Sequence, residues 1–237
     1  MATIKDKVIL ITGGSKGIGY GIAEVLLAEG AKVAITSRTQ SSADEAAKHL
    51  SGKKENVLAI AADVRDESSQ QKAVNKVLQE WGRLDALIAN AGLGHFDSIE
   101  NLTSAQWLET VDTNLTGVFY SVKSSIPALK DSKGYIITIA SLAGTNFFAG
   151  GAAYNASKFG LVGFSQAIML DLRSCGIKVS TIMPGSVATE FNGGSPNDKD
   201  AWKIQPEDIG QMVADLLKMN PRTLPSKIEV RPSMPPK

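Results

Sequence analysis

Short apolar runs rich in β-branched residues alternate with longer segments of helical periodicity, and this alternation limits the possible folds more than any other feature. The runs consist mostly of apolar residues, as in strands buried on both faces. They occupy residues 7–12, 32–37, 56–63, 84–90, 134–141 and 177–184, and one last short strand is expected at about 227–231. Helices between successive strands require right-handed crossovers and a parallel sheet. We therefore expect an α/β fold, a doubly wound parallel sheet of about seven strands with helices on both faces.

The segments between the runs also carry helix signals. Gly30, Gly82 and Gly176 each follow such a segment, where a C-terminal cap would lie. Asp66 stands where it could cap the helix after the third strand. Residues 103–129 are expected to form one long helix.

Length, charge and cysteine content narrow the class of protein. The chain has 237 residues and no internal repeat or linker before about residue 190, so we predict one domain over 1–237 with a frayed tail at 232–237. Its net charge is +1, without a long run of one sign, which argues against nucleic acid or a membrane as partner. The single cysteine, Cys175, cannot form an intrachain disulfide, and with no targeting segment visible we expect a cytoplasmic protein.

Four glycines follow the first predicted strand in the stretch TGGSKGIG, which spans residues 12–19. Glycine permits positive φ and close approach of the backbone to a ligand, and the N-terminus of the next helix attracts an anion. The turn therefore suits the pyrophosphate of a dinucleotide. Its spacing, Gly-x-x-x-Gly-x-Gly, differs from the usual dinucleotide fingerprint, so a tight turn with close helix–sheet packing is the alternative.

The end of the second strand bears on which dinucleotide is bound. A carboxylate there would accept from the adenosine ribose, but this strand ends in Ser37 and Arg38. Arg38 and Lys16 could neutralise a 2′-phosphate, so we predict NADP(H) in preference to NAD(H). Alternatively, Arg38 is only a solvated charge. Asp63, at the end of the third strand, is placed to meet the adenine.

Further motifs follow in a fixed order. They are Asn90-Ala91-Gly92, Asn114, Ser141 thirteen residues before Tyr154, the stretch YNASK at 154–158, and Pro184-Gly185. With the glycine turn, they resemble the short-chain dehydrogenase/reductase family over about residues 5–190. The resemblance implies a single Rossmann-type domain that moves a hydride between a nicotinamide and a carbonyl or alcohol carbon. The cofactor-binding residues that we expect are Gly13, Ser15, Lys16, Gly17, Ile18, Gly19, Ser37, Arg38, Asp63, Val64, Asn90, Ala91, Gly92, Tyr154, Lys158, Pro184, Gly185, Val187 and Thr189.

The expected catalytic residues are Ser141, Tyr154, Lys158 and Asn114. Reduction of a ketone needs a proton for the developing alkoxide, and the phenol of Tyr154 can supply it. Lys158 lies one helical turn away, where its charge would lower the phenol pKa. Ser141 would hydrogen-bond the substrate oxygen. By resemblance, Lys158 also holds the nicotinamide ribose, and Asn114 binds a water that links Lys158 to solvent.

The alternative for Tyr154 and Lys158 is a surface contact on one helix face. Asn114 could instead bond the helix backbone. His95 lies near the expected substrate entrance, but a lone loop histidine is more often solvated than catalytic.

Residues 190–205 occupy the place of the family's substrate lid, and their composition predicts a mobile loop with Phe191 and Trp202 as apolar covers. This lid is short for a 3-oxoacyl-[acyl-carrier-protein] reductase and is more similar to those of sepiapterin-reductase-like and 3-hydroxy-acid dehydrogenase members. We expect an NADPH-dependent reductase of a ketone or aldehyde, with those three types as alternatives. A non-catalytic NADP-binding sensor is a remote one. Resemblance also implies a homo-oligomer, tetramer or dimer.

Overall fold

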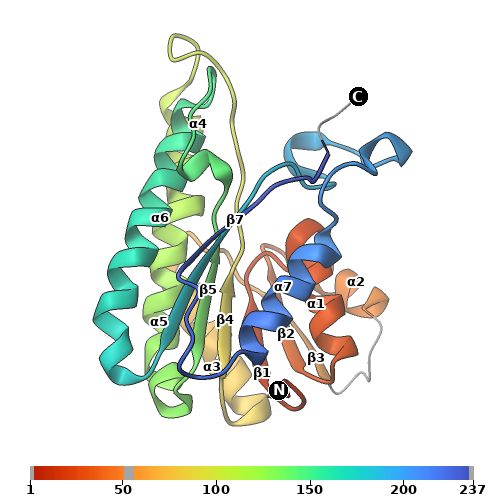
Figure 1. Cartoon of the computed structure of the whole chain (residues 1–237), viewed down its shortest axis with the longest axis vertical. Coiled ribbons are helices and arrows are strands. Elements are labelled where there is room, and N and C mark those ends of the chain that lie inside the picture. Colours follow the sequence, from red (N-terminus) through yellow and green to blue (C-terminus); the bar gives the residue numbers. More distant parts are fainter. Residues whose placement is uncertain (1–2, 51–55, 235–237) are drawn as a thin grey trace.

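Seven parallel strands form one open sheet in the computed structural model, which describes residues 3–50 and 56–234 (Figure 1). Their order is β3-β2-β1-β4-β5-β6-β7, and every neighbouring pair is parallel. The strands are β1 Val8–Ile11, β2 Lys32–Ser37, β3 Val57–Ala61, β4 Ala86–Ala89, β5 Tyr135–Ile139, β6 Lys178–Pro184 and β7 Lys227–Val230. The predicted α/β fold is confirmed, and the strand ends differ from the predicted ones by a few residues.

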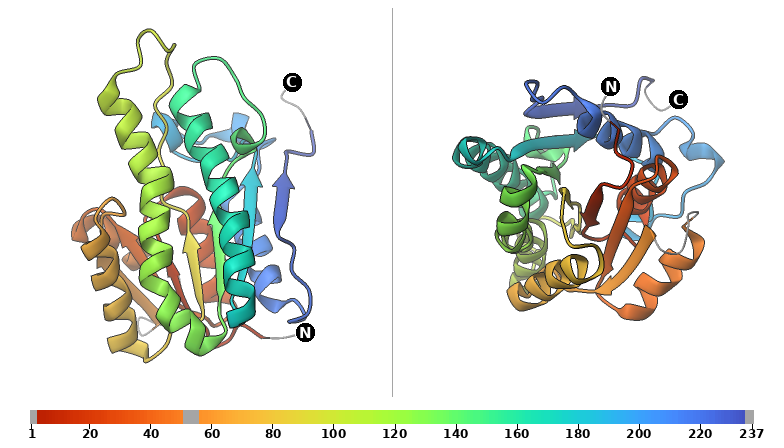
Figure 2. Two further views of the ribbon diagram at one scale, coloured as in Figure 1. Left: turned by 90° about the vertical axis from the view of Figure 1, so that its left-hand side faces the viewer. Right: turned by 90° about the horizontal axis from the view of Figure 1, so that it is seen from below.

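Helices cover both faces of the sheet, as the views in Figure 2 show. One face packs against α1, α2 and α7, and the other packs against α3, α5 and α6. The helices are α1 Gly17–Ala28, α2 Gln40–His49, α3 Glu67–Trp81, α4 Ser104–Val111, α5 Gly117–Ser132, α6 Ala152–Leu172 and α7 Pro206–Lys218. Within the described residues, no helix is long and apolar enough to span a membrane.

Alternate residues of the central strand point into two separate cores. In β1, Ile9 and Ile11 belong to the core beneath α1 and α7, whereas Val8 and Leu10 belong to the core beneath α3 and α5. This follows from the two-residue repeat of a strand. It explains why β1 is apolar at every position rather than at every second one.

The predicted long helix over 103–129 is wrong in one respect, because a π-helical turn, Asp112–Thr116, separates α4 from α5. The helical periodicity of the sequence continues across it, and one inserted residue leaves no clear break in that pattern. The other helix signals are confirmed. Gly82 ends α3 with a φ of 72°, Gly176 follows α6 with a φ of 81°, and the Asp66 side chain accepts from the Ser68 N–H at the start of α3.

The strand order reverses between β1 and β4. In an open α/β sheet, a crevice forms outside the carboxyl ends of the strands at such a point. The glycine turn follows β1 and the Asn90-Ala91-Gly92 turn follows β4, so the topology brings both to that crevice.

Candidate active site

One cleft of roughly 1550 Å³ lies at the carboxyl ends of the strands. It contains residues from the glycine turn, from the ends of β2, β3, β4 and β6, from α6, and from the segment after β6. All of the predicted catalytic and cofactor-binding residues line it except Gly19 and Asn114. Residues that are far apart in sequence therefore share a single cavity.

The glycine turn has the geometry of an anion cradle. Gly13 and Gly17 adopt φ values of +63° and +56°, which side chains rarely tolerate. A Cβ on Gly13 would lie 2.8 Å from the Cα of Ala91, so the two turns touch. Lys16 is the N-cap of α1, and its side chain makes no capping hydrogen bond, which leaves that helix end to a ligand. The turn thus fits a dinucleotide pyrophosphate.

Gly19 serves this turn indirectly. A Cβ there would collide with the Gly13 carbonyl oxygen and lie 2.5 Å from the amide nitrogen of Asn90. That amide donates to the carbonyl oxygens of Thr12 (3.0 Å) and Gly13 (2.9 Å). The Thr12 hydroxyl in turn accepts from the backbone N–H groups of Asn90 and Ala91. The sequence analysis missed Thr12, although its position at the end of β1 is a usable signal.

Ser37, Arg38 and Lys16 line the cleft together at the end that would hold the adenosine ribose. The Ser15 hydroxyl donates to the Ser37 hydroxyl at 3.3 Å, which joins the glycine turn to the end of β2. Neither Ser37 nor Arg38, at the end of this strand, carries a carboxylate. Lys16 and Arg38 thus lie in one cleft, and their contact with a 2′-phosphate stays a prediction.

Asp63 lies in the cleft, but its carboxylate already binds a guanidinium. Arg65 donates to it through Nε and Nη2, the latter at 2.7 Å. The hydrogen bond from Arg65 lowers the pKa of Asp63 against the opposing effect of burial. Since an adenine amino group would have to share this carboxylate with Arg65, the predicted contact is more constrained than the sequence suggested.

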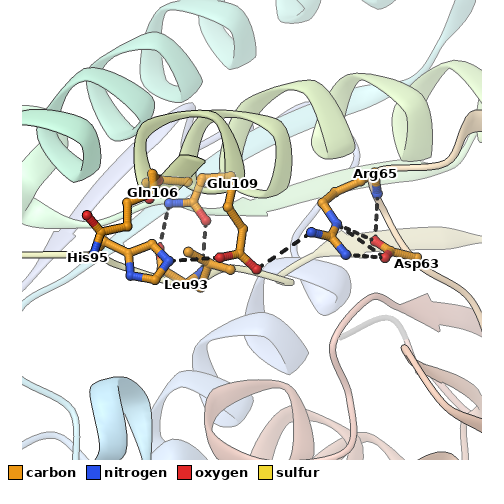
Figure 3. Close-up of polar contacts among 8 residues, drawn as sticks. Asp63, Arg65, Leu93, His95, Gln106 and Glu109 are labelled. Carbon is orange, nitrogen blue, oxygen red and sulfur yellow. Dashed lines mark hydrogen bonds and ion pairs between the residues drawn. The ribbon is translucent and has the colours of Figure 1, made fainter. Parts of the chain in front are cut away.

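A chain of polar contacts continues from Arg65 to Glu109 and His95 (Figure 3). Nη1 of Arg65 lies 3.6 Å from Glu109 of α4, and the other oxygen of Glu109 lies 2.9 Å from Nε2 of His95. His95 is 32% exposed and pairs with Glu109, so it is a partly solvated loop histidine with a partner in α4. The chain connects the end of β3 to the loop after β4.

Ser141, Tyr154 and Lys158 meet where β5 ends and α6 begins. The Ser141 side chain lies close enough to the Tyr154 phenol to exert a lowering effect on its pKa. The Nζ atom of Lys158 lies 5.6 Å from the centroid of the Tyr154 ring and donates to the carbonyl oxygen of Ile139 at 3.1 Å. The three side chains therefore form one cluster, not a surface contact, and Lys158 is only 4% exposed.

Burial controls protonation in this cluster. It lowers the pKa of Lys158 to about 8, because the charged ammonium loses hydration. It also raises the pKa of Tyr154, against the lowering effect of the Ser141 side chain. The sequence analysis expected Lys158 to lower the pKa of the phenol, whereas burial raises it overall.

Asn114 lies in the π-helical turn and is fully buried. Its side-chain amide donates to the Leu93 carbonyl oxygen (2.8 Å) and to the Ser157 hydroxyl (3.0 Å), and its oxygen accepts from the Leu93 N–H (2.9 Å). The side chain thus fastens the loop after β4 to α6, beside Lys158. The alternative of a bond to its own helix backbone is not what the structure shows.

Comparison with known proteins agrees with this geometry. The family model for short chain dehydrogenases matches residues 7–200. The chain belongs to the short-chain dehydrogenase family. A relative, trans-4-hydroxycyclohexanecarboxylate dehydrogenase of Sinomonas cyclohexanicum, is 34% identical over 90% of this chain and 85% of its own length. The protein is thus an oxidoreductase that acts on CH–OH or C=O groups.

Two solved structures of this kind superpose over nearly the whole chain. A 3-ketoacyl-(acyl-carrier-protein) reductase from Brucella melitensis complexed with NADH has a TM-score of 0.88 and 26% identity, covering 98% of this chain and 99% of its own. An alcohol dehydrogenase from Thermococcus sibiricus complexed with 5-hydroxy-NADP has a TM-score of 0.87 and 27% identity, covering 97% of both chains. A nicotinamide cofactor is thereby supported.

In this dehydrogenase, Asn155 is a positioning residue that the sequence analysis did not single out. Its amide donates to the carbonyl oxygens of Ala143 and Asn146, each at 2.8 Å. It thereby holds the loop that follows Ser141 against the start of α6. Its place next to Tyr154 was the one signal available in the sequence.

The segment over 190–205 contains two short 3₁₀ turns, Phe191–Gly193 and Asp198–Asp200. Phe191 lines the cleft, as expected of a lid residue, whereas Trp202 does not. Trp202 instead lies beneath the ammonium of Lys203, 5.9 Å from its ring centroid.

Proposed function

We propose that this dehydrogenase is an NADPH-dependent reductase of a ketone or aldehyde, with Tyr154 as proton donor. The observation that carries the proposal is the cluster of Tyr154, Ser141 and Lys158 in the same cleft as the glycine turn. A sensor that binds NADP without turnover would have no need of this cluster. We therefore favour an enzyme over a non-catalytic NADP-binding sensor.

The bound dinucleotide would supply the hydride to the carbonyl carbon of the substrate. Ser141 would donate a hydrogen bond to the substrate oxygen and stabilise its growing negative charge. Tyr154, whose raised pKa keeps the phenol protonated, would transfer its proton to that oxygen. Lys158, in its ammonium form, would stabilise the phenolate that remains. Asn114 would keep the neighbouring loop and α6 in register.

The preference for NADP(H) is supported by Lys16, at the start of α1, and Arg38, after β2, which line the same cleft. The two solved relatives are complexes with NADH and with 5-hydroxy-NADP, so kinship alone supports either dinucleotide. The charge argument therefore carries this part of the proposal.

For the substrate, reduction of a 3-oxoacyl thioester remains a second candidate because a structural relative is named as such a reductase. A 3-hydroxy-acid or sepiapterin-type substrate is a third, on the grounds of the short lid.

We propose a single functional domain in the cytoplasm, with residues 190–205 as a lid that becomes ordered on binding.

We also propose a tetramer or dimer. Exposed apolar side chains on α5 and α6, among them Phe119 (41%) and Phe159 (42%), support this assembly. The rings of Phe119 and Phe164 lie 6.4 Å apart and join the two helices into one outer face. Light scattering after size-exclusion chromatography would test it, and a monomer across the concentration range would contradict it.

The central test is turnover. Purified protein is mixed with NADPH and a panel of ketones, aldehydes and 3-oxoacyl thioesters, and loss of NADPH absorbance is followed. We expect Tyr154→Phe to reduce kcat by at least about 100-fold, as expected when a general acid is removed, with little change in NADPH affinity. Full activity of this variant would reject the proton donor, and dinucleotide binding without turnover of any panel member would favour the sensor.

A further inference from the structure

Three phenylalanine rings gather beside the Tyr154 ring, and we call them the phenyl wall: Phe96, Phe148 and Phe191. They come from the loop after β4, the loop after β5 and the lid, segments that extend from the same end of the sheet (Figure 1). Ring centroids of Phe96 and Phe191 lie 5.3 and 5.8 Å from that of Tyr154, and Phe148 lies 5.9 Å from Phe96.

The phenyl wall is not part of either hydrophobic core. Phe96, Phe148 and Phe191 remain 37%, 49% and 41% exposed. Phe191 and Tyr154 line the cleft, and the other two rings extend its apolar surface outward. An exposed apolar surface next to the group that donates the proton is placed to contact the remainder of a substrate.

The backbone leaves room for these rings at two glycines. A Cβ on Gly94 would lie 2.6 Å from Cζ of Phe96 and 3.2 Å from Cζ of Phe191. A Cβ on Gly151 would lie 2.7 Å from Cε2 of Phe148. Any other residue at either place would push a ring away.

Hydrogen bonds fix the two loops that carry the wall. The Asp97 N–H donates to the Gly150 carbonyl oxygen at 3.0 Å and ties one loop to the other. The Phe148 N–H donates to Oδ1 of Asn155 at 3.4 Å. Phe96 and Phe148 are thus held before a substrate arrives, which reduces the entropy lost on binding.

The lid end of the cleft carries little attraction for an anion. Three charged residues of the lid line the cleft, namely Glu190, Asp200 and Lys203. Lys203 pairs with Asp200 at 2.7 Å, so its charge is already compensated. Beside the lid, a substrate carboxylate or phosphate would therefore approach the carboxylate of Glu190, whose repulsion disfavours it.

From the wall and this charge, we infer that the substrate is a neutral ketone or aldehyde bearing an aromatic or alicyclic ring, which packs against Phe96, Phe148 and Phe191 while Tyr154 and Ser141 bind its carbonyl oxygen. The inference rests on the proposed carbonyl reduction and specifies its substrate class. It predicts a lower kcat/KM for carboxylate-bearing ketones and for acyl thioesters of coenzyme A than for neutral ring ketones.

The test compares matched substrates on the full chain with NADPH. Acetophenone and 2-butanone differ in the ring, and acetophenone and 4-acetylbenzoate differ in one carboxylate; acetoacetyl coenzyme A represents the thioesters. We expect kcat/KM for acetophenone to exceed that for each of the other three by about 10-fold or more, the effect of a few aromatic contacts or one repelled charge.

Variants of the phenyl wall then test where the ring of the substrate binds. Phe148→Ala and Phe96→Ala should each lower kcat/KM for acetophenone by about 3- to 10-fold while changing that for 2-butanone less than 2-fold. Phe147→Ala is the matched control, because Phe147 is the chain neighbour of Phe148 and is 85% exposed, and it should change neither. Phe148→Leu, which keeps apolar bulk, guards against a loss caused by misfolding and should retain an intermediate preference.

Binding provides a readout that does not need turnover. Acetophenone is titrated calorimetrically into the protein saturated with NADP⁺, a complex that cannot reduce it. We expect the dissociation constant to rise about 3- to 10-fold in Phe148→Ala and to stay unchanged in Phe147→Ala.

The outcomes separate this inference from the proposed function. Turnover of 2-butanone, 4-acetylbenzoate or acetoacetyl coenzyme A with kcat/KM equal to or above that of acetophenone would overturn the inference and leave carbonyl reduction standing. Equal losses for all substrates in Phe96→Ala and Phe148→Ala would also overturn it, since the rings would then only support Tyr154. Dinucleotide binding without reduction of any ketone would overturn the proposed function and this inference with it.

Discussion

The buried ammonium of Lys158 sets the expected pH dependence at the scale of single residues. In reduction, the Tyr154 phenol must carry its proton and Lys158 must carry its charge. Burial raises the pKa of the first group and lowers that of the second to about 8. The phenol is therefore protonated throughout the neutral range, and the lysine is the group that changes state.

We expect kcat/KM for ketone reduction to fall as pH rises through about 8, because Lys158 then loses the charge that stabilises the phenolate. Initial rates from pH 6 to 10 test this, with circular dichroism to verify that the fold persists. Residual activity of Lys158→Arg, whose guanidinium stays charged, should show no such decline. A flat wild-type profile to pH 9.5 would contradict the assignment.

Arg38 is the second residue-scale case. Replacement by aspartate removes a partner for the 2′-phosphate and adds a carboxylate that can accept from the ribose hydroxyls. We expect the ratio of kcat/KM for NADPH to that for NADH to fall by about 10- to 100-fold in Arg38→Asp, the equivalent of losing one hydrogen bond to a charged group. An unchanged ratio would leave Arg38 as a solvated charge.

At the scale of elements, close contact between two turns forms the proposed dinucleotide cradle. The glycine turn after β1 touches the Asn90 turn after β4, and the Asn90 amide bridges them. Neither turn could hold this shape alone, since each supplies the hydrogen-bond partners of the other. The absence of a Cβ at Gly19 is what permits that approach.

Gly19→Ala should therefore weaken NADPH binding by at least about 10-fold, because the methyl group displaces the Asn90 amide and the Gly13 carbonyl. Fluorescence titration of NADPH measures it. Gly163→Ala is the matched control: this helical glycine in α6 has no atom within 4 Å of its would-be Cβ. It should leave NADPH affinity unchanged and, by helix propensity, stabilise the fold by up to about 1 kcal/mol. Equal affinities of the two variants would contradict this account of the cradle.

At the scale of the whole molecule, Asp85 joins β1, β4 and β5 at their amino ends, opposite the cleft. Its buried carboxylate accepts from the Val8 N–H (3.0 Å), Lys7 (3.1 Å) and Arg83 (2.6 Å). Its backbone accepts from the Tyr135 N–H at 2.9 Å. Burial would raise the pKa of Asp85, but hydrogen bonds from Arg83, Val8 and Lys7 lower it overall.

A lowered pKa means that this stabilisation is complete above the unfolded value, near 4, and is lost as pH falls through the lower folded value. Asp85→Asn should thus destabilise the protein by about 1–3 kcal/mol at pH 7, and the difference from wild type should shrink below about pH 4. Urea unfolding at several pH values measures it. Activity of the folded variant should be unchanged, and a difference that grows in acid would refute the assignment.

The sequence by itself determined that the sheet is parallel, because each apolar run is followed by a segment long enough to form a crossover helix. It also predicted the residues of the glycine turn and of the Ser141, Tyr154 and Lys158 cluster from their local spacing, and the structure brings them to one cleft. Six of the seven strands were predicted from apolar runs that alternate with helices. The seventh, β7, was predicted from one short stretch near the end of the chain, and it is also confirmed.

Tertiary structure decided what depends on contacts between distant segments. The π-helical turn at Asn114 leaves the helical periodicity intact, the pairing of Asp63 with Arg65 depends on side-chain direction, and the pKa order of Tyr154 and Lys158 depends on burial. The phenyl wall is the clearest case, because Phe96, Phe148 and Phe191 carry no common motif. They meet only because three loops leave the sheet at one end, and desolvation and ring packing act between neighbours in space, which sequence order does not record.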